Sequence, residues 1–433
     1  MLGLSLGPTA AAMRAAGRHP PGATLALDFL AWRAYAAGLG APALGALLQT
    51  ARSAAAGHRG ADGRFREAAA NTPRRDHSAA GAPLGLRCEG PATYQGVNSL
   101  LAGAAAGSPG TLPTGWSAPV AAGLTRTIAI DDAGGLPRLR IRYAGAPAAN
   151  FQFILQMLPA ATLAAAAGQT WTPGLYMTAA GTGLPACGFG IWETDAGGAI
   201  LRSTNVPVTP GAAWTRRSQT VTLGAGTAFL RLLASTGIVA AGTACDFEIA
   251  VGGATLTETG RLPSERLVGT AAAARDGDGI HLPTGAWFNP LAGTLLTEWV
   301  IPQDDPAAAV AAIASLNDGT AGNRVTLHHA AASDRSGGAV LAAGVPSFDA
   351  TAAPAYVYGA VRRHALAWAA DGAEACVDGV LSAADATVTP PAGLVRLDLG
   401  AAAPNASPLD GWLRRVTYWP TRRSGAEMQA DQA

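Results

Sequence analysis

Amide side chains with both donor and acceptor atoms recur on one side of the segment Phe151–Met157. If this segment is a strand, alternate side chains point to opposite faces, so its apolar residues enter a core and Gln152 and Gln156 share the other face. An amide can donate and accept hydrogen bonds at once, which suits a ligand that carries several hydroxyl groups. The pattern therefore indicates polar ligand binding and not catalysis.

A tryptophan occupies the corresponding face of a second expected strand, Gly188–Thr194. Phe189 and Ile191 define the core face. Trp192 lies on the opposite face, where the preceding positions are glycines and therefore carry no side chain. Apolar stacking on such a ring, with hydrogen bonds from nearby amides, is how a sheet can receive a sugar. We therefore predict a carbohydrate-binding site of Gln152, Gln156 and Trp192 on a concave, partly exposed surface. The alternative is that a loop or another subunit covers this face and Trp192 only packs there.

Metal ligands are poorly represented in the sequence. His328 and His329 are adjacent, so on a strand they would point to opposite faces. Asp304–Asp305 and Asn317–Gly319 supply oxygen atoms of the kind that calcium binds, but the same residues are common in turns. The four cysteines are far apart and include no CxxC, which indicates free thiols. We expect no metal and no other cofactor.

Catalytic motifs are also missing from the sequence, which has no serine elbow, no P-loop and no HExxH. Glu193, Glu248 and Glu298 fall on expected strands, but nothing in their spacing marks two of them as facing each other, as glycoside hydrolysis requires. We therefore expect no catalytic residue and no enzyme activity.

Composition excludes several other classes of protein. The chain has 433 residues, enough for two or three domains, and its 30 basic and 29 acidic residues are scattered, so no basic face for nucleic acid is evident. Even the uncharged segment Tyr143–Trp192 has no run of about twenty apolar residues, so we expect no membrane insertion. Only 14% of residues are charged, while 55 are Gly and 29 are Pro, which favours a turn-rich β protein.

Eight short strands with turn residues between them are expected from about residue 110 to residue 262, which suggests a two-sheet sandwich. They are Thr125–Ile130, Leu139–Tyr143, Phe151–Met157, Gly174–Thr178, Gly188–Thr194, Gln219–Leu223, Ala228–Leu233 and Asp246–Val251.

Two hairpins and a capped helix are expected in the last seventy residues. His364–Ala369 and Ala373–Val377 read as paired strands, and Asp371–Gly372 and Asp378–Gly379 are typical of type I′ turns. Ser424–Glu427 has the capping-box pattern that opens a helix.

These hairpins and the capped helix resemble the closing part of the concanavalin A-like jelly rolls, of the laminin-G type, at the C-terminus of many phage virion proteins. Residues 61–93 resemble the leader that precedes the sandwiches in such proteins, although Tyr94–Val97 is an insertion relative to that pattern. The segments at Trp171–Met177, Ile191–Gly198 and Trp214–Arg217 are similar to a carbohydrate-binding-module jelly roll.

The resemblance implies an all-β fold with two consecutive antiparallel β-sandwich (jelly-roll) domains after an N-terminal anchor and leader region. The expected parts are residues 1–109 as virion anchor and leader, 110–262 as a carbohydrate-binding-module-like sandwich, and 263–433 as a concanavalin A-like jelly roll with a short C-terminal helix.

The resemblance also implies a structural component of a phage or phage-derived gene-transfer particle, as a head spike, head fibre or tail fibre. Such a protein is assembled in the bacterial cytoplasm, lies on the exterior of the virion and binds host surface polysaccharide. Its expected partners are other copies of itself and, through the N-terminal region, a virion base, capsid or tail protein. The alternatives are a spacer or decoration protein that binds no sugar and, less favoured, a polysaccharide depolymerase.

Overall fold

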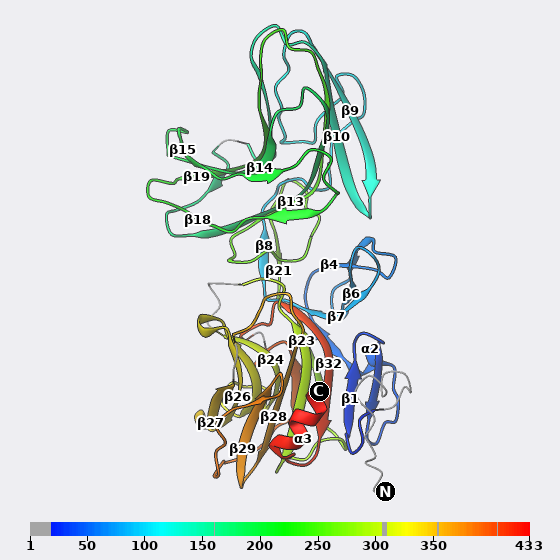
Figure 1. Ribbon diagram of the computed structural model, residues 1–433, viewed down its shortest axis with the longest axis vertical. Coiled ribbons are helices and arrows are strands. Elements are labelled where there is room, and N and C mark those ends of the chain that lie inside the picture. Colours follow the sequence, from blue (N-terminus) through cyan, green and yellow to red (C-terminus); the bar gives the residue numbers. More distant parts are fainter. Residues whose placement is uncertain (1–18, 160, 305–309, 353–354, 405) are drawn as a thin grey trace, which may run out of the picture. The chain divides into compact units, whose positions relative to one another are not determined.

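The computed structural model describes residues 19–159, 161–304, 310–352, 355–404 and 406–433, mostly as antiparallel β-strands (Figure 1). The chain forms two compact units. Unit 1 contains the described part of residues 1–63 with residues 68–91 and 276–433, and unit 2 contains residues 64–67 and 92–275. Unit 2 is therefore inserted into the sequence of unit 1, and the predicted all-β sandwich class is confirmed.

Unit 1 is built from two antiparallel sheets. The nine-stranded sheet has the order β2-β1-β32-β23-β28-β29-β30, with β7 also paired to β32 and β6 to β7. Its strands are β1 Leu25–Asp28, β2 Arg33–Ala36, β6 Arg75–His77, β7 Pro83–Cys88, β23 Gly293–Val300, β28 Arg362–Ala369, β29 Gly372–Val377, β30 Val380–Leu381 and β32 Gly411–Trp419. The seven-stranded sheet, ordered β27-β26-β25-β24-β31-β22-β3, contains β3 Gln49–Ala51, β22 Gly279–Pro283, β24 Val310–Asn317, β25 Arg324–Ala330, β26 Arg335–Ala342, β27 Val345–Ala352 and β31 Arg396–Leu399.

The remaining short elements are α2 Leu44–Leu47, β4 Ala56–Arg59, β5 Phe65–Ala68, the 3₁₀ turn η1 Ala331–Ser333 and α3 Gly425–Gln432. Large aromatic side chains such as Trp299, Trp368 and Tyr418 are fully buried in the core of unit 1. None of the described helices is long and apolar enough to cross a membrane.

The first described strands belong to the sheet that the C-terminal strand also joins. We expected residues 1–109 to form an anchor and leader apart from both sandwiches, yet β1 pairs with β32 in register, Leu25 opposite Tyr418. Leu25 and Leu27 are fully buried, so the alternating apolar residues of β1 extend the core of unit 1. Residues 1–18 of the expected anchor lie outside the described residues.

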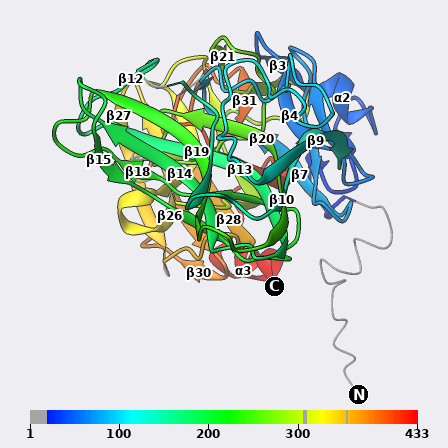
Figure 2. The ribbon, with the colours of Figure 1, turned by 90° about the horizontal axis from the view of Figure 1, so that it is seen from above.

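The expected hairpins and helix at the C-terminal end are present. Asp378 and Gly379 have φ values of 47° and 81°, as a type I′ turn requires, whereas Gly372 is the first residue of β29. Figure 2 shows α3 beside β28 and β30, and Met428 of this helix packs in one buried cluster with Cys376.

Unit 2 contains the other two sheets. The eight-stranded sheet has the order β17-β13-β20-β10-β9, with β18 paired to β13, β8 to β20 and β21 to β8. Its strands are β8 Ala92–Tyr94, β9 Leu124–Ala133, β10 Leu136–Gly145, β13 Thr170–Thr182, β17 Arg216–Ser218, β18 Val221–Thr222, β20 Cys245–Thr257 and β21 Ala273–Arg275. The six-stranded sheet, ordered β11-β19-β14-β15 with β12 on β19 and β16 on β14, contains β11 Phe151–Gln156, β12 Leu163–Ala164, β14 Cys187–Thr194, β15 Ile200–Ser203, β16 Val206–Val208 and β19 Phe229–Val239.

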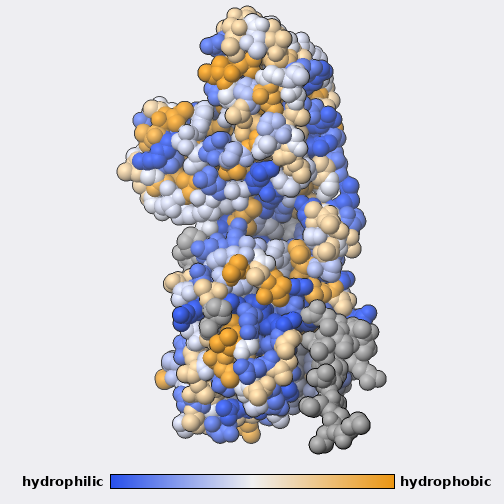
Figure 3. Space-filling view, in the orientation of Figure 1, coloured by the Kyte–Doolittle hydropathy of each residue, from blue (hydrophilic) through white to orange (hydrophobic). Residues whose placement is uncertain are grey.

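All eight strands expected between residues 110 and 262 are present in unit 2. Their inward side chains, including Phe153, Phe189 and Phe247, form one buried cluster between the two sheets. Exposed apolar side chains form small separate patches on the face drawn in Figure 3; one of these patches lies at β15, where Ile200 and Leu201 are exposed.

Candidate functional site

The predicted site residues lie on the outer face of the six-stranded sheet of unit 2. Gln152 is exposed and Gln156 half-buried on β11, and Trp192 is half-buried on β14. Their neighbours Phe153 and Ile191 are fully buried on the core side, so the predicted alternation of faces is correct. Trp192 therefore does not lie in the core between the sheets.

The strand register separates these three residues. On β19, Ile238 lies opposite Gln152, Leu233 lies opposite Gln156, and Arg231 lies opposite Trp192. At about 3.3 Å per residue, the partners of Gln152 and Trp192 are roughly 23 Å apart along the strand. Gln156 and Trp192 lie about 12 Å apart by the same geometry, with strands spaced about 4.8 Å. No single sugar ring can contact all three.

The part of this face where β14 carries glycine is covered by another segment of the same chain. A Cβ atom on Gly190 would collide with the carbonyl oxygen of Thr204, and one on Gly188 with the side chain of Asn205. The segment between β15 and β16 therefore lies over both glycines, as the covering alternative supposed. The amide of Gln152 donates to the carbonyl oxygen of Thr236 at 2.8 Å. The role of Gln152, Gln156 and Trp192 in sugar binding stays a prediction.

The three glutamates considered for hydrolysis each have an arginine partner. Glu193 Oε2 accepts hydrogen bonds from Thr227 Oγ1 at 2.6 Å and from Arg202 Nη1 at 3.2 Å. Burial raises the pKa of Glu193, but the hydrogen bonds and Arg202 outweigh it, so the pKa is below its ordinary value. Glu248 pairs with Arg140 at 2.8 Å, and Glu298 pairs with Arg414 at 3.3 Å and with Arg415 at 3.2 Å. The contacts of these glutamates stabilise the sheets.

The residues considered for calcium take part in turns and hydrogen bonds. Asp318 accepts hydrogen bonds from Thr320 and Asn323, which lower its pKa. Asp304 accepts a hydrogen bond from Tyr358 at 2.9 Å, and Asp305 lies outside the described residues. Among the residues that the structure describes, no group of three or more His, Cys, Asp or Glu side chains is placed to hold a metal ion.

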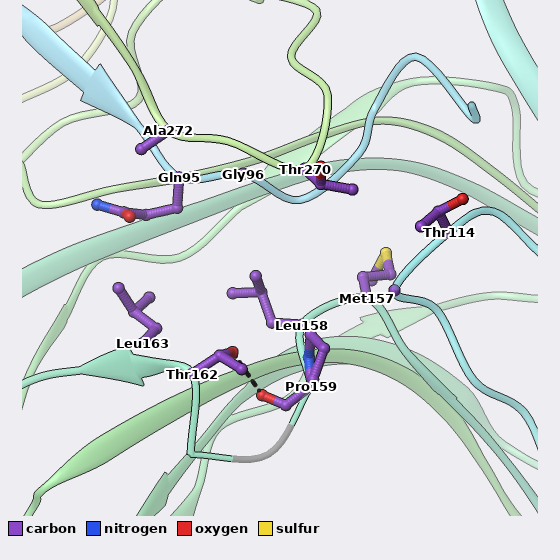
Figure 4. Close-up of a pocket in the computed structure, with 11 residues that line it drawn as sticks. Gln95, Gly96, Thr114, Met157, Leu158, Pro159, Thr162, Leu163, Thr270 and Ala272 are labelled. Atoms are coloured by element: carbon purple, nitrogen blue, oxygen red, sulfur yellow. Dashed lines mark hydrogen bonds between the residues drawn. The ribbon is translucent and has the colours of Figure 1, made fainter. Parts of the chain in front are cut away.

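A cavity of about 250 Å³ opens in unit 2, beyond the end of β11. The lining residues come from four separate stretches of chain and include no charged side chain. They are Gln95, Gly96, Thr114, Gly115, Met157, Leu158, Pro159, Thr162, Leu163, Thr270 and Ala272. Figure 4 shows two opposed walls, one from residues 95–96, 114, 270 and 272 and the other from residues 157–159 and 162–163.

The two walls differ in chemistry. The wall of residues 157–159 and 162–163 is mainly apolar, because four of its five side chains belong to Met157, Leu158, Pro159 and Leu163. The opposite wall carries the amide of Gln95 and the hydroxyls of Thr114 and Thr270. An apolar surface that faces a few uncharged donors and acceptors is a general feature of small-molecule sites.

The polar wall is held in place by two buried residues, Asn98 and Ser99. Asn98 Nδ2 donates to the carbonyl oxygen of Thr114 at 2.9 Å, and the Asn98 main-chain N–H donates to Gly269. Ser99 Oγ accepts a hydrogen bond from the N–H of Val268 at 2.8 Å. Two loops distant in sequence are thereby held beside each other.

Gly96 allows two segments of this wall to approach each other closely. A Cβ atom at this position would collide with the main chain of Thr270 and Ala271, so only glycine lets the 95–96 and 270–272 segments touch. Gln95, Gly96, Thr114 and Thr270 were not among the predicted site residues. The available signal was the insertion Tyr94–Val97, because an insertion relative to a resembling pattern is a place where a site can be added.

No protein-family model and no curated protein matches the chain. Among solved structures, the CBM40 of Ruminococcus gnavus IT-sialidase, bound to α2,6-sialyllactose, is similar over 34% of this chain and 85% of its own length, with 18% identity and a TM-score of 0.29. The tandem CBM22-1–CBM22-2 of Paenibacillus barcinonensis Xyn10C is similar over 71% and 94%, with 11% identity and a TM-score of 0.22. Trypanosoma rangeli sialidase, in complex with the inhibitor DANA, is similar over 71% and 66%, with 11% identity and a TM-score of 0.27. Similarity at this level assigns no ligand and no residue role to this chain.

Proposed function

We propose that this protein is a glycan-binding structural component of a phage or phage-derived particle, placed on the particle exterior to contact host surface polysaccharide. The observation that carries the binding function is the cavity of unit 2, in which an apolar wall faces the uncharged polar side chains of Gln95, Thr114 and Thr270. The lining has no titratable side chain, so the cavity offers groups for binding and none for acid–base hydrolysis.

The particle assignment is supported by the sequence resemblance of the leader and of the C-terminal hairpins with their capped helix. Fold alone does not define function, so this part needs its own test. We expect mass spectrometry of particles purified from the source bacterium to detect the chain. We also expect several copies per particle, because multivalency converts weak sugar contacts into useful avidity.

The binding function is tested by calorimetric titration of the purified full-length protein with capsular polysaccharide and lipopolysaccharide glycan from the presumed host. We expect saturable binding that a Gln95→Leu variant weakens. Binding lost in Trp192→Ala but kept in Gln95→Leu would move the site to the outer face of the six-stranded sheet.

The second candidate is a spacer or decoration protein that binds no sugar. The coverage of Gly188 and Gly190 by the segment after β15 favours this reading for the outer face. The absence of binding to every host glycan, together with presence in the particle, would establish it.

A further inference from the structure

We propose that the cavity of unit 2 takes one uncharged, hydroxyl-rich sugar unit and that Gln95, Thr114 and Thr270 determine this preference. The inference rests on the proposed glycan-binding function and names the class of sugar that the site accepts.

Three polar side chains of the lining are available to a ligand. Among the described residues, the side chains of Gln95, Thr114 and Thr270 have no hydrogen-bond partner within the protein, whereas Thr162 Oγ1 donates to the carbonyl oxygen of Pro159 at 2.8 Å. An amide offers two donors and one acceptor oxygen, and each threonine hydroxyl can donate or accept. This mixed set matches sugar hydroxyls, which also both donate and accept.

The opposite wall suits the apolar face of a sugar ring. Pro159 is exposed and Leu163 half-buried, so their side chains supply the apolar surface that a ligand can contact. Met157 and Leu158, which are 1% and 6% exposed, pack behind this surface and keep it rigid. The volume of about 250 Å³ is below the roughly 300–1,000 Å³ typical of pockets for drug-sized ligands. This size selects a single ring, with the rest of a glycan chain outside.

The cavity has no charged side chain among its described lining residues. None of the described lining residues is Arg, Lys or His, so a sugar carboxylate placed here would lose water without gaining a cation. Such desolvation is costly for an ionised group, even when the site is partly open. A neutral hydroxymethyl group at the same position meets no such cost.

The polar wall is already ordered for binding. The N–H of Gln95 donates a hydrogen bond to Leu256 O, which holds Gln95 in place. Gly96 is held by its close contact with Thr270. Asn98 and Ser99 fix the two loops that carry Thr114 and Thr270, as described above. A site whose walls are ordered before binding spends less of its interaction energy on ordering itself.

Matched neutral and acidic sugars test the class of ligand. The probes are the methyl glycosides of glucose, galactose and mannose and the methyl glycosides of the corresponding uronic acids, which differ only in having a carboxylate in place of the hydroxymethyl group. Saturation-transfer NMR with the full-length protein at pH 7 should detect at least one neutral glycoside, with its uronide bound at least about tenfold more weakly.

Three near-isosteric substitutions in the site have matched controls elsewhere in unit 2. Thr114→Val and Thr270→Val remove hydroxyls, and Thr125→Val makes the same change at an exposed position of strand β9. Gln95→Leu removes the amide, and Gln219→Leu is its exposed control. We expect each site variant to weaken binding of the neutral sugar about threefold to tenfold, and each control to leave it within twofold. Unchanged thermal unfolding of the site variants shows that they fold.

A second readout uses the host polysaccharide itself, before and after chemical reduction of its carboxyl groups to alcohols. We expect the reduced polymer to bind more weakly to Gln95→Leu than to the parent protein. We also expect the parent protein to bind the reduced polymer at least as tightly as it binds the native polymer. Equal binding of a uronide and its neutral partner, loss of binding on carboxyl reduction, or unchanged binding by all site variants would each overturn the proposal and leave the proposed glycan-binding function intact. Failure of the parent protein to bind any host glycan would overturn both.

Discussion

Asn98 holds the cavity-rim residue Thr114 through a side-chain hydrogen bond, from Asn98 Nδ2 to the carbonyl oxygen of Thr114 at 2.9 Å. The same amide nitrogen donates to Ala102 O at 3.0 Å, and Asn98 Oδ1 accepts from the N–H of Ala102, also at 3.0 Å. Asn98 is 1% exposed and has a φ of 51°, a left-handed conformation that asparagine tolerates better than most residues. One buried side chain therefore closes the loop that carries the rim.

Replacing this residue should loosen the rim and lower stability. Asn98→Ala removes three side-chain hydrogen bonds and places a Cβ-bearing apolar residue at a positive φ, so we expect the free energy of unfolding of unit 2 to fall by about 2–4 kcal/mol. Guanidinium denaturation measures this change. Asn98→Gly removes the same hydrogen bonds without the backbone strain and should be less destabilising. Equal stability of Asn98→Ala and the parent protein would contradict this account of the loop.

A fully buried ion-pair network ties distant segments of unit 1 together. Arg74 Nη2 lies 2.7 Å from Glu89 Oε2 and also contacts Asp278, whose other carboxylate oxygen lies 2.6 Å from Arg52 Nη1. All four side chains are inaccessible to solvent. Burial lowers the pKa of Arg74, but Asp278 and Glu89 outweigh it and raise the pKa above its ordinary value.

Arg74→Met should destabilise unit 1 by about 3–5 kcal/mol, because it leaves Glu89 with less charge compensation in the interior and removes an arginine partner of Asp278. The exposed pair Arg142–Asp246, with side chains 53% and 48% exposed, provides the control. Arg142→Met should leave stability nearly unchanged, because a solvent-exposed ion pair contributes little. Urea denaturation followed separately for the two units measures both effects. Comparable losses for the two variants would show that burial of the network contributes little.

Local signals predicted the parts of the fold that depend on local chemistry. The Asp378–Gly379 turn and the Ser424 cap each follow from residues within four positions, and both are present. The pairing of β1 with β32 joins segments almost four hundred residues apart, and no local pattern specifies it. Val395 has the period-two spacing of the buried Leu397 and Leu399, yet it precedes the strand and is 54% exposed.

The candidate site shows the same limit. Period-two alternation correctly placed Gln152, Gln156 and Trp192 on one face, but their separation depends on the register with β19. The cavity depends on contacts among four loops, of which the Gly96–Thr270 approach is one, and only tertiary packing creates it. Glycine at positions 188 and 190 was compatible with a sugar face and with a covering segment, and the structure shows the segment.

The terminal helix α3 should depend on its capping box. Ser424 Oγ accepts a hydrogen bond from the N–H of Glu427, and the Glu427 carboxylate accepts one from the N–H of Ser424 at 2.7 Å, which lowers the pKa of Glu427. Ser424→Ala should cost about 1 kcal/mol of local stability, measured as faster amide hydrogen exchange in residues 425–433. Glu427→Gln preserves the capping geometry and should exchange more slowly than Ser424→Ala. The reverse order would mean that the carboxylate charge matters more than the cap.

Arg423, the residue before the cap, connects α3 to β32. Its guanidinium lies 2.8 Å from Asp431 and 4.7 Å from the ring centre of Trp419. Arg423→Ala should therefore increase hydrogen exchange along α3, whereas Arg423→Leu would keep only the packing on Trp419. Equal protection in the parent and both variants would show that Arg423 is not needed to dock the helix.

Two buried histidines make unit 1 sensitive to acid. Burial is the largest cause of the low pKa values of His329 and His364, and Arg362 and His328 lower both further. The pKa of His329 falls to about 4, because Asp334 and Asp304 offset only part of these effects. The pKa of His364 is also well below its ordinary value.

The sign of the pH dependence follows from proton binding. Between the ordinary histidine pKa of about 6.5 and the folded-state pKa of His329, about 4, the unfolded chain binds a proton that the folded chain does not. The free energy of unfolding of unit 1 should therefore be highest above pH 6.5 and should fall as the pH drops through this window. Urea denaturation at pH 7, 6, 5 and 4.5 measures the slope. His329→Phe, which retains a ring beside Trp299 and Tyr356, should make the slope shallower because one titrating group is removed. If the slope is the same in His329→Phe and the parent protein, His329 is not one of the groups that make the fold acid-sensitive.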